Sequence, residues 1–259
     1  MSSYFKAQYA GAVSGTQLPA AAVFAPVDDG SGRVEAVVRR LAEAVALGLI
    51  ADGDQLPAEL DLAASLNVST VTLRAALAEL RDRGLVETRR GRGGGTFVRG
   101  PADPSAARLR RRLRDLSTAE LREIGDYRGA VAGTAARLAA ERASAENVAR
   151  LRQVLDGLRA ATTVAARRRA DGRFHIEVAA AAQSVRLTRA EIDLQAEVGE
   201  LLWLPYSEAD EVVRSHGQVI DAIAARDGAR ARAITEAHID KGIERLMDFH
   251  WRLVATAPE

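Results

Sequence analysis

The chain has 259 residues, enough for two domains, and its 36 basic and 35 acidic residues leave a net charge of +1. The absence of cysteine excludes disulfides, thiolate metal sites and cysteine nucleophiles. The apolar runs are far shorter than the roughly 20 residues that cross a bilayer, and the first residues lack a signal-peptide pattern, so we expect a soluble cytoplasmic protein without membrane contact. Only 4% of the residues are aromatic, and the abundance of alanine and arginine favours helices over strands.

The first hundred residues predict a flexible tail followed by a small domain at 33–99. Residues 1–32 are rich in small residues and proline and show no periodicity, which predicts a mobile tail. Apolar residues then recur at helical spacing, and the period later changes to that of a hairpin around the glycine-rich loop 89–95. The predicted elements are helices at 33–49, 58–66 and 69–83 and strands at 85–88 and 96–98. This order is a helix, a helix-turn-helix and a β-hairpin.

The rest of the chain reads as helix throughout, without an internal repeat. The stretch 100–107 is rich in proline and alanine, and we predict a linker over 100–117 that contains one short helix. Residues 118–253 should form an all-α bundle of six to seven helices. The predicted helices lie near 105–114, 118–142, 145–160, 164–182, 186–203, 208–226 and 228–253. The expected fold is therefore mainly α, a winged helix-turn-helix followed by a helical bundle.

An uneven charge distribution points to nucleic acid as a partner of the first domain. Residues 81–114 hold 11 arginines against three acidic residues, a local charge of +8 in a nearly neutral chain. The leucines of the third helix form one side, whereas Thr70, Val71 and Arg74 point away and can enter a major groove. An amphipathic helix and a basic loop are also common as ordinary surface. The candidate DNA contacts are Ser69, Thr70, Val71, Thr72 and Arg74 of the helix and Arg89, Arg90, Arg92 and Gly93 of the loop.

Three of the four histidines interrupt apolar faces of the second domain. His175 follows Asp171 by four residues, so both lie on one inward face. His216 is centred in an apolar stripe, and His238 shares a face with small and apolar residues. Each of them alone is most often a hydrogen-bonded core residue. If the helices converge, three nitrogens and one oxygen suit zinc, nickel, cobalt or manganese. His250 lies about a third of a turn from His238 on the same helix and is left out of the set.

Arg128 raises a similar question, because its helix face otherwise carries apolar residues such as Leu121, Ile124 and Val131. An arginine keeps its charge, so its burial demands an anion. A structural glutamate would satisfy this demand, and so would the carboxylate of a ligand held by two parallel hydrogen bonds.

The segment LPAELDLAASLNVSTVTLRAALAELRDRGLVETRRGRGGGTFV resembles the winged helix-turn-helix of GntR-family transcription regulators. The resemblance covers roughly 33–99 and departs from the family at two positions. Leu60 and Thr70 stand where family members usually carry arginines that contact DNA, and only Arg74 matches the third customary arginine. The resemblance therefore implies a base readout that differs from the common operator, with Thr70 and Val71 suited to thymine methyl groups.

The second domain resembles the FCD effector domain of the FadR subfamily, through DGRFH at 171–175 and HGQVIDAI at 216–223. Many FCD domains bind a divalent metal through an Asp and three His with this spacing, and the metal and a helix-borne Arg then bind a small carboxylate. The resemblance implies Asp171, His175, His216 and His238 as metal ligands, with zinc, nickel or manganese as the ion, and Arg128 as the effector-binding arginine.

Three positions of the second domain depart from that family pattern. Val131 and Ala132 stand where Leu-Glu often follows the arginine, and Ser184 stands at a frequent pocket asparagine. We therefore expect Ser184 to lie in an effector pocket of altered shape, which leaves the class of carboxylate open.

These observations predict a metabolite-responsive transcription regulator, in this family most often a repressor. One winged unit reads only a few base pairs, so we expect a homodimer on a palindromic double-stranded operator. A metal-dependent enzyme using the Asp/His site and a helical scaffold with a structural metal are the alternatives. No HExxH motif is present, and no acidic residue stands beside a ligand histidine as a general base would, which favours a regulator over an enzyme.

Overall fold

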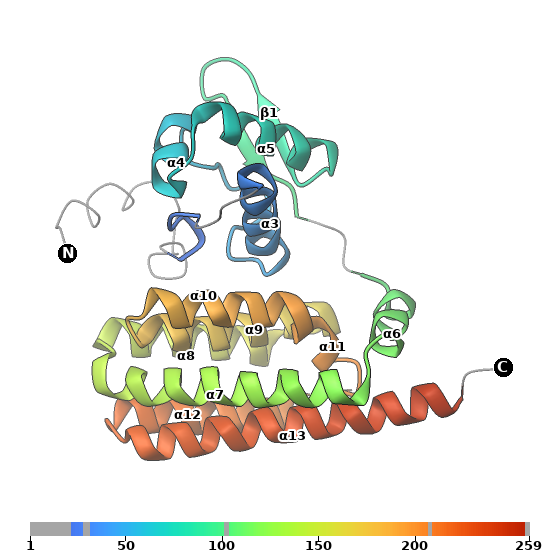
Figure 1. The fold of residues 1–259 in the computed structure, drawn as a ribbon. Helices are drawn as coiled ribbons and strands as arrows, with labels where there is room; N and C mark the ends of the chain where they lie inside the picture. Colours follow the sequence, from blue (N-terminus) through green and yellow to red (C-terminus); the bar gives the residue numbers. More distant parts are fainter. Residues whose placement is uncertain (1–21, 28–31, 101–103, 207–208, 257–259) are drawn as a thin grey trace. The chain divides into compact units, whose positions relative to one another are not determined.

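The computed structural model describes residues 22–27, 32–100, 104–206 and 209–256, and the chain divides into two compact units, 1–102 and 103–259 (Figure 1). The fold is mainly helical, as predicted, and the described residues form a single two-stranded sheet. Within those ranges, no helix combines the length and the apolar character needed to cross a membrane.

Over residues 32–100 the first unit consists of three helices followed by a β-hairpin. Ser69 begins the third helix, where its side chain accepts a hydrogen bond from the backbone N–H of Thr72. Asn67 ends the preceding helix in the left-handed conformation, with φ of 56°. The hairpin is antiparallel and pairs Val86 with Val98. The elements are α3 (Arg33–Ala46), α4 (Glu59–Leu66), α5 (Thr70–Asp82), β1 (Val86–Arg89) and β2 (Gly95–Val98).

Residues 22–27 are packed, so the prediction of a mobile tail is wrong for this stretch. The N–H of Val27 donates to the carbonyl of Leu66 at 3.0 Å, and the side chain of Arg40 donates to the carbonyl of Pro26 at 3.2 Å. Phe24 is only 5% exposed. The stretch is too short to show a periodicity, which is why its sequence pattern did not indicate packing. The other tail residues, apart from Gly32, lie outside the described ranges.

The second unit is a helical bundle (Figure 1). Its elements are α6 (Ala106–Arg114), α7 (Thr118–Arg142), α8 (Ala145–Ala160), α9 (Val164–Ala181), α10 (Val185–Leu194), the π-helix η1 (Gln195–Gly199), α11 (Glu200–Leu202), α12 (Asp210–Ala224) and α13 (Gly228–Ala255).

Two features of this unit differ from the sequence-based expectation. The short helix α6, placed in a linker over 100–117, packs into the bundle, because Leu109 and Leu113 are buried in one apolar cluster with Leu121. The single helix expected over 186–203 is interrupted by the π-helix, which inserts an extra residue into a helical turn.

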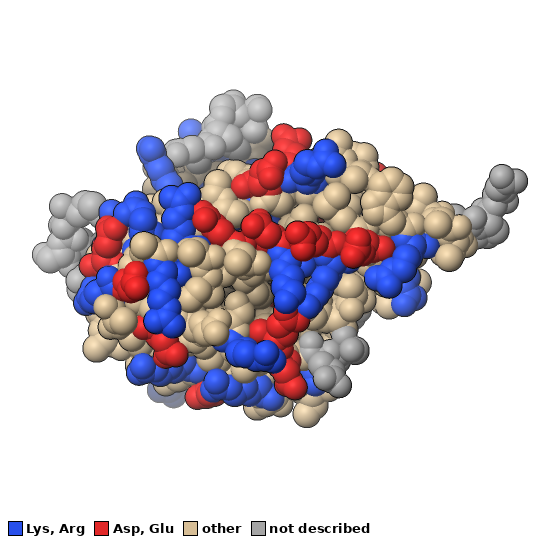
Figure 2. Space-filling model, turned by 90° about the horizontal axis from the view of Figure 1, so that it is seen from below, with Lys and Arg blue, Asp and Glu red and all other residues tan. Residues whose placement is uncertain are grey.

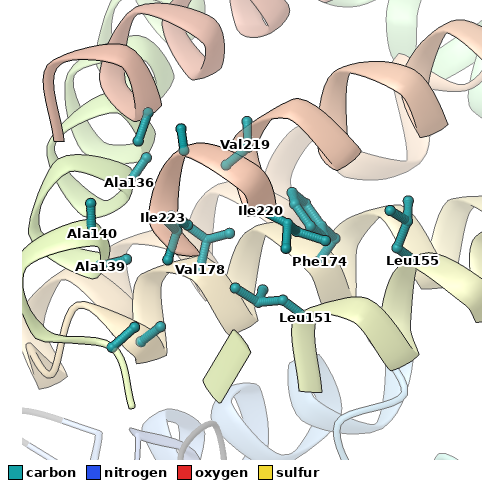
Figure 3. Close-up of a cluster of buried hydrophobic side chains, with 14 of the residues drawn as sticks. Ala136, Ala139, Ala140, Leu151, Leu155, Phe174, Val178, Val219, Ile220 and Ile223 are labelled. Carbon is teal, nitrogen blue, oxygen red and sulfur yellow. The ribbon is translucent and has the colours of Figure 1, made fainter. Parts of the chain in front are cut away.

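Small residues allow the helices of the bundle to approach closely. α7 and α13 run antiparallel side by side (Figure 1), and a Cβ added at Gly125 would lie 3.0 Å from Ile243. On its other faces α7 contributes alanines to a cluster with α8, α9 and α12 (Figure 3). The cluster includes Ala136 and Ala140 of α7, Phe174 of α9, and Ile220 and Ile223 of α12 (Figure 3). This packing places polar side chains of α7, α9, α12 and α13 within reach of one another.

Candidate metal centre and DNA-reading surface

The four predicted metal ligands lie together in the bundle. α9 contributes Asp171 and His175 one turn apart, α12 contributes His216 and α13 contributes His238. One potential ligand atom from each residue lies within 4.8 Å of all the others. Asp171 Oδ1 is 3.4 Å from His216 Nε2 and 3.9 Å from His175 Nε2. Three helices thus bring three imidazoles and one carboxylate to a single point.

Burial controls the protonation of this cluster. Desolvation lowers the pKa of His175 and His216 well below the usual range and that of His238 to about 4. Desolvation raises the pKa of Asp171 to about 6, although the Trp203 hydrogen bond and Arg128 oppose that shift. The imidazoles are therefore neutral near pH 7, which is the form that binds metals.

Unpartnered atoms in the cluster fit a cation. Asp171 Oδ1 and both ring nitrogens of His216 are buried without a hydrogen-bond partner. Leaving such an atom unpaired costs about 1–3 kcal/mol. Phe174 stacks on the His216 ring, with 3.8 Å between the centroids, and so fixes its plane. One divalent ion would satisfy the carboxylate oxygen and a nitrogen of each imidazole, so the residues present fit a metal.

Arg128 lines a cavity beside these ligands. The cavity is also lined by Asp171, His175, His238, Trp203 and Tyr206. Arg128 is 2% exposed, and its Nε and Nη1 have no hydrogen-bond partner. Burial lowers the pKa of Arg128, and the charges of Glu191 and Asp171 oppose that shift. A buried guanidinium with open donors can bind a carboxylate, and it holds one through two parallel hydrogen bonds along its Nε/Nη2 or its Nη1/Nη2 edge.

Ser184, predicted in the effector pocket, instead begins α10. Its side chain accepts a hydrogen bond from the N–H of Leu187 at 3.3 Å, and it lines neither cavity beside the histidines. A serine just before a helix is a common N-cap, so local backbone chemistry explains this residue. Ala132, another departure from the family pattern, does line a cavity with the histidines.

Trp203 and Tyr206 line the cavity, and the sequence pattern did not indicate them. They follow the π-helix, where the helical periodicity that could have shown an inward face is broken. His250 is buried with both ring nitrogens unpartnered, yet it lies outside the four-residue cluster, as expected.

The predicted recognition helix presents the expected side chains. Val71 is 75% exposed and the Arg74 side chain 70%, while Thr70 and Thr72 are partly buried and Ser69 is exposed. Nε of Arg74 donates to Glu59 of α4 at 2.7 Å. A bidentate contact to guanine can use the two terminal nitrogens of Arg74. The contact with Glu59 uses Nε and therefore leaves both terminal nitrogens available.

The conformation of the hairpin loop depends on glycines with positive φ. Gly91 and Gly93 have φ of 92° and 84°, which only glycine adopts readily. Arg90 and Arg92 are exposed at the tip. Arg89 is paired with Glu87 and lies over Phe97, 4.2 Å from the ring centroid. Two of the three predicted loop arginines are therefore exposed at the tip, whereas Arg89 already has partners within the hairpin.

The helical unit presents a different charge pattern. Figure 2 shows acidic and basic side chains interleaved on the face seen from below, with a row of acidic residues across it. α13, the lowest helix in Figure 1, carries acidic residues at four-residue intervals. These are Glu236, Asp240, Glu244 and Asp248. Because basic side chains are interleaved with this row, the face presents no continuous basic patch for a phosphate backbone.

Each of the two units matches a known protein family. Residues 33–98 match the model for bacterial regulatory proteins of the gntR family, and residues 123–241 match the FCD domain. A Mycobacterium gastri protein described as an HTH-type transcriptional regulator, RmpR, is 42% identical over 221 residues, 83% of this chain and 81% of that protein. An Escherichia coli protein described as a regulatory protein of the L-lactate dehydrogenase operon is 32% identical over 198 residues, 72% of this chain and 76% of its own length.

A solved structure shows the same fold. Escherichia coli McbR/YncC superposes with a TM-score of 0.52 at 18% identity, over 85% of this chain and all of the other. The relatives are transcription regulators, so the enzyme alternative does not hold. The chain belongs to the GntR family of DNA-binding transcription regulators and carries an FCD domain as its second unit.

Proposed function

We propose that this regulator is a repressor whose FCD domain holds one divalent metal and responds to a small organic carboxylate. The observation that carries the proposal is the cluster of Asp171, His175, His216 and His238 beside the unpartnered guanidinium of Arg128. When bound, the metal would supply a positive charge that attracts an anionic ligand.

A carboxylate suits this cavity better than a neutral sugar or a lipid tail. The metal would leave residual positive charge after Asp171 binds it, and Arg128 adds a second positive group on the same cavity. One carboxylate can interact with both the metal ion and the Arg128 guanidinium. Zinc, nickel and manganese all accept this donor set, and an octahedral ion would keep two positions for the ligand. The name of the Escherichia coli relative, which refers to an L-lactate dehydrogenase operon, is consistent with a small hydroxycarboxylate.

The DNA side of the proposal is a homodimer that binds a palindromic operator in the cytoplasm. Two winged units related by a two-fold axis double the number of base pairs read. Ala136, Ala139 and Ala140 of α7 are buried inside this chain's own bundle and are not available for a dimer contact, whereas Ala119 and Ala130 are exposed. Ligand binding must favour one arrangement of the two DNA-reading units over the other, because equal affinity for both would change nothing.

The direct test combines metal analysis with DNA binding. We expect about one divalent ion per chain by elemental analysis, and a dimer by light scattering. In gel shifts with the DNA upstream of its own gene, metal-loaded protein should bind and a small carboxylate should weaken that binding. Chelated protein should lose the response to the carboxylate. Binding that no carboxylate changes, with or without metal, would contradict the proposal.

We expect Arg74 to be the principal base-reading side chain. Arg74→Ala should cost about 1–3 kcal/mol on the operator and little on random DNA, because a bidentate contact to a base discriminates whereas a phosphate contact does not. Arg90→Ala is the matched control and should weaken both kinds of DNA alike. Fluorescence anisotropy with the two DNAs measures the difference. An equal loss for Arg74→Ala on both DNAs, or no loss on the operator, would assign base reading elsewhere.

A further inference from the structure

Trp203 makes a buried hydrogen bond to one of the proposed metal ligands. Its indole Nε1 donates to Asp171 Oδ2 at 3.0 Å, and the residue is only 3% exposed. The other carboxylate oxygen, Oδ1, has no partner and lies 3.4 Å from His216 Nε2. The indole thus engages one oxygen and leaves the other directed at the imidazoles.

The π-helix brings Trp203 to this position. Gln195 opens the π-helix, and its Nε2 donates to Glu191 Oε1 at 2.8 Å. Its Oε1 lies against two glycines: a Cβ would lie 3.2 Å away if added at Gly172 and 2.5 Å away if added at Gly199. Gly172 directly follows Asp171, so the Gln195 side chain of the π-helix lies against α9 beside the proposed ligand. The extra residue of the π-turn then rotates the following residues relative to a regular helix.

We propose that Trp203 is a positioning residue that holds the Asp171 carboxylate with Oδ1 toward the metal site. Without this bond the carboxylate can turn and offer either oxygen, or neither, to an ion. Hydrogen bonds to a ligand fix its orientation, and their removal typically weakens metal binding 10- to 100-fold. Trp203 also lines the cavity that holds Arg128, so its ring borders the space assigned to the carboxylate effector. This inference rests on the proposed metal site.

The experiment uses the full chain and two conservative variants. Trp203→Phe keeps an aromatic ring but removes the donor, and Trp251→Phe changes the exposed second tryptophan, which is 59% exposed. Zn²⁺ is titrated against a competing chelator. We expect roughly 10- to 100-fold weaker Zn²⁺ binding for Trp203→Phe and wild-type binding for Trp251→Phe. The helical circular-dichroism signal of the metal-free protein should stay unchanged in both, which a loss of the helical fold would not allow.

Fluorescence gives a second measurement that does not depend on how Trp203→Phe folds. In Trp251→Phe the only tryptophan is Trp203, and we expect its emission to change as Ni²⁺ saturates the site. Unchanged emission at saturation would contradict the contact between Trp203 and the liganded carboxylate.

The outcomes separate the two proposals. If wild-type protein binds no divalent ion, or binds it equally after His216→Ala, the metal site itself is wrong. If binding depends on His216 but Trp203→Phe binds Zn²⁺ as tightly as wild type, the site stands and the positioning role of Trp203 is wrong.

Discussion

Replacing His175 and His216 together by alanine is expected to remove the divalent metal from the purified protein. The two imidazoles come from different helices, and both approach Asp171 Oδ1 within 4 Å. Losing two of four ligands leaves one nitrogen and one oxygen, so the affinity should fall by more than the roughly 100-fold that the loss of a supporting hydrogen bond can cause. His216→Ala alone should lose most of the metal and make DNA binding insensitive to the carboxylate.

His250→Ala is the matched control for this experiment. His250 is also a buried histidine with both ring nitrogens unpartnered, but it lies outside the four-residue cluster. The cavity left in the bundle is therefore comparable, and we expect wild-type metal content by elemental analysis. Metal retained at wild-type occupancy in the His175/His216 double variant would show that the four residues are ordinary polar groups of the core.

Replacing Arg128 by alanine is expected to keep the metal and lose the response to the effector. Arg128 is not one of the four clustered ligands, but it lines the same cavity, with Nε and Nη1 unpartnered. A hydrogen bond to a charged group contributes about 1.5–3 kcal/mol, so effector affinity should fall roughly 10- to 150-fold. Calorimetric titration of the carboxylate into metal-loaded protein measures this change, and elemental analysis checks the metal.

Arg128→Met distinguishes a ligand-binding arginine from a structural one. Methionine has a similar length and no charge, so it removes the desolvation cost that lowers the pKa of Arg128. If the guanidinium serves a ligand, the effector-free variant should be at least as stable as wild type in thermal unfolding. Removing one partner of a buried structural ion pair costs about 3–5 kcal/mol, and a loss of that size would assign Arg128 to the fold, with Glu191 as its partner.

Local sequence patterns were sufficient to predict the positions of most helices and most residues of the candidate site. The ranges of α7, α8 and α13 follow from apolar periodicity and from serine and aspartate caps, which are properties of neighbouring residues. The convergence of the four predicted metal ligands could be anticipated for the same reason. The i, i+4 spacing puts Asp171 and His175 on one face of their helix. The faces that carry His216 and His238 are also apolar, so all three faces are expected to be buried in one core.

Only the tertiary structure decided which polar groups meet. Ser184 satisfies the first turn of its own helix instead of facing the cavity. Trp203 reaches Asp171, 32 residues earlier in the chain, because a π-turn changes the direction of its helix. Residues 22–27 pack although they are too short to show a period, and α6, predicted as a helix within a linker, packs through Leu109 and Leu113. These contacts depend on how closely helix backbones approach and on which rotamer fills the remaining space, and both are set by the whole packed core. The sequence pattern predicts on which face of its helix a side chain lies. It does not predict which side chain of another helix will lie next to it.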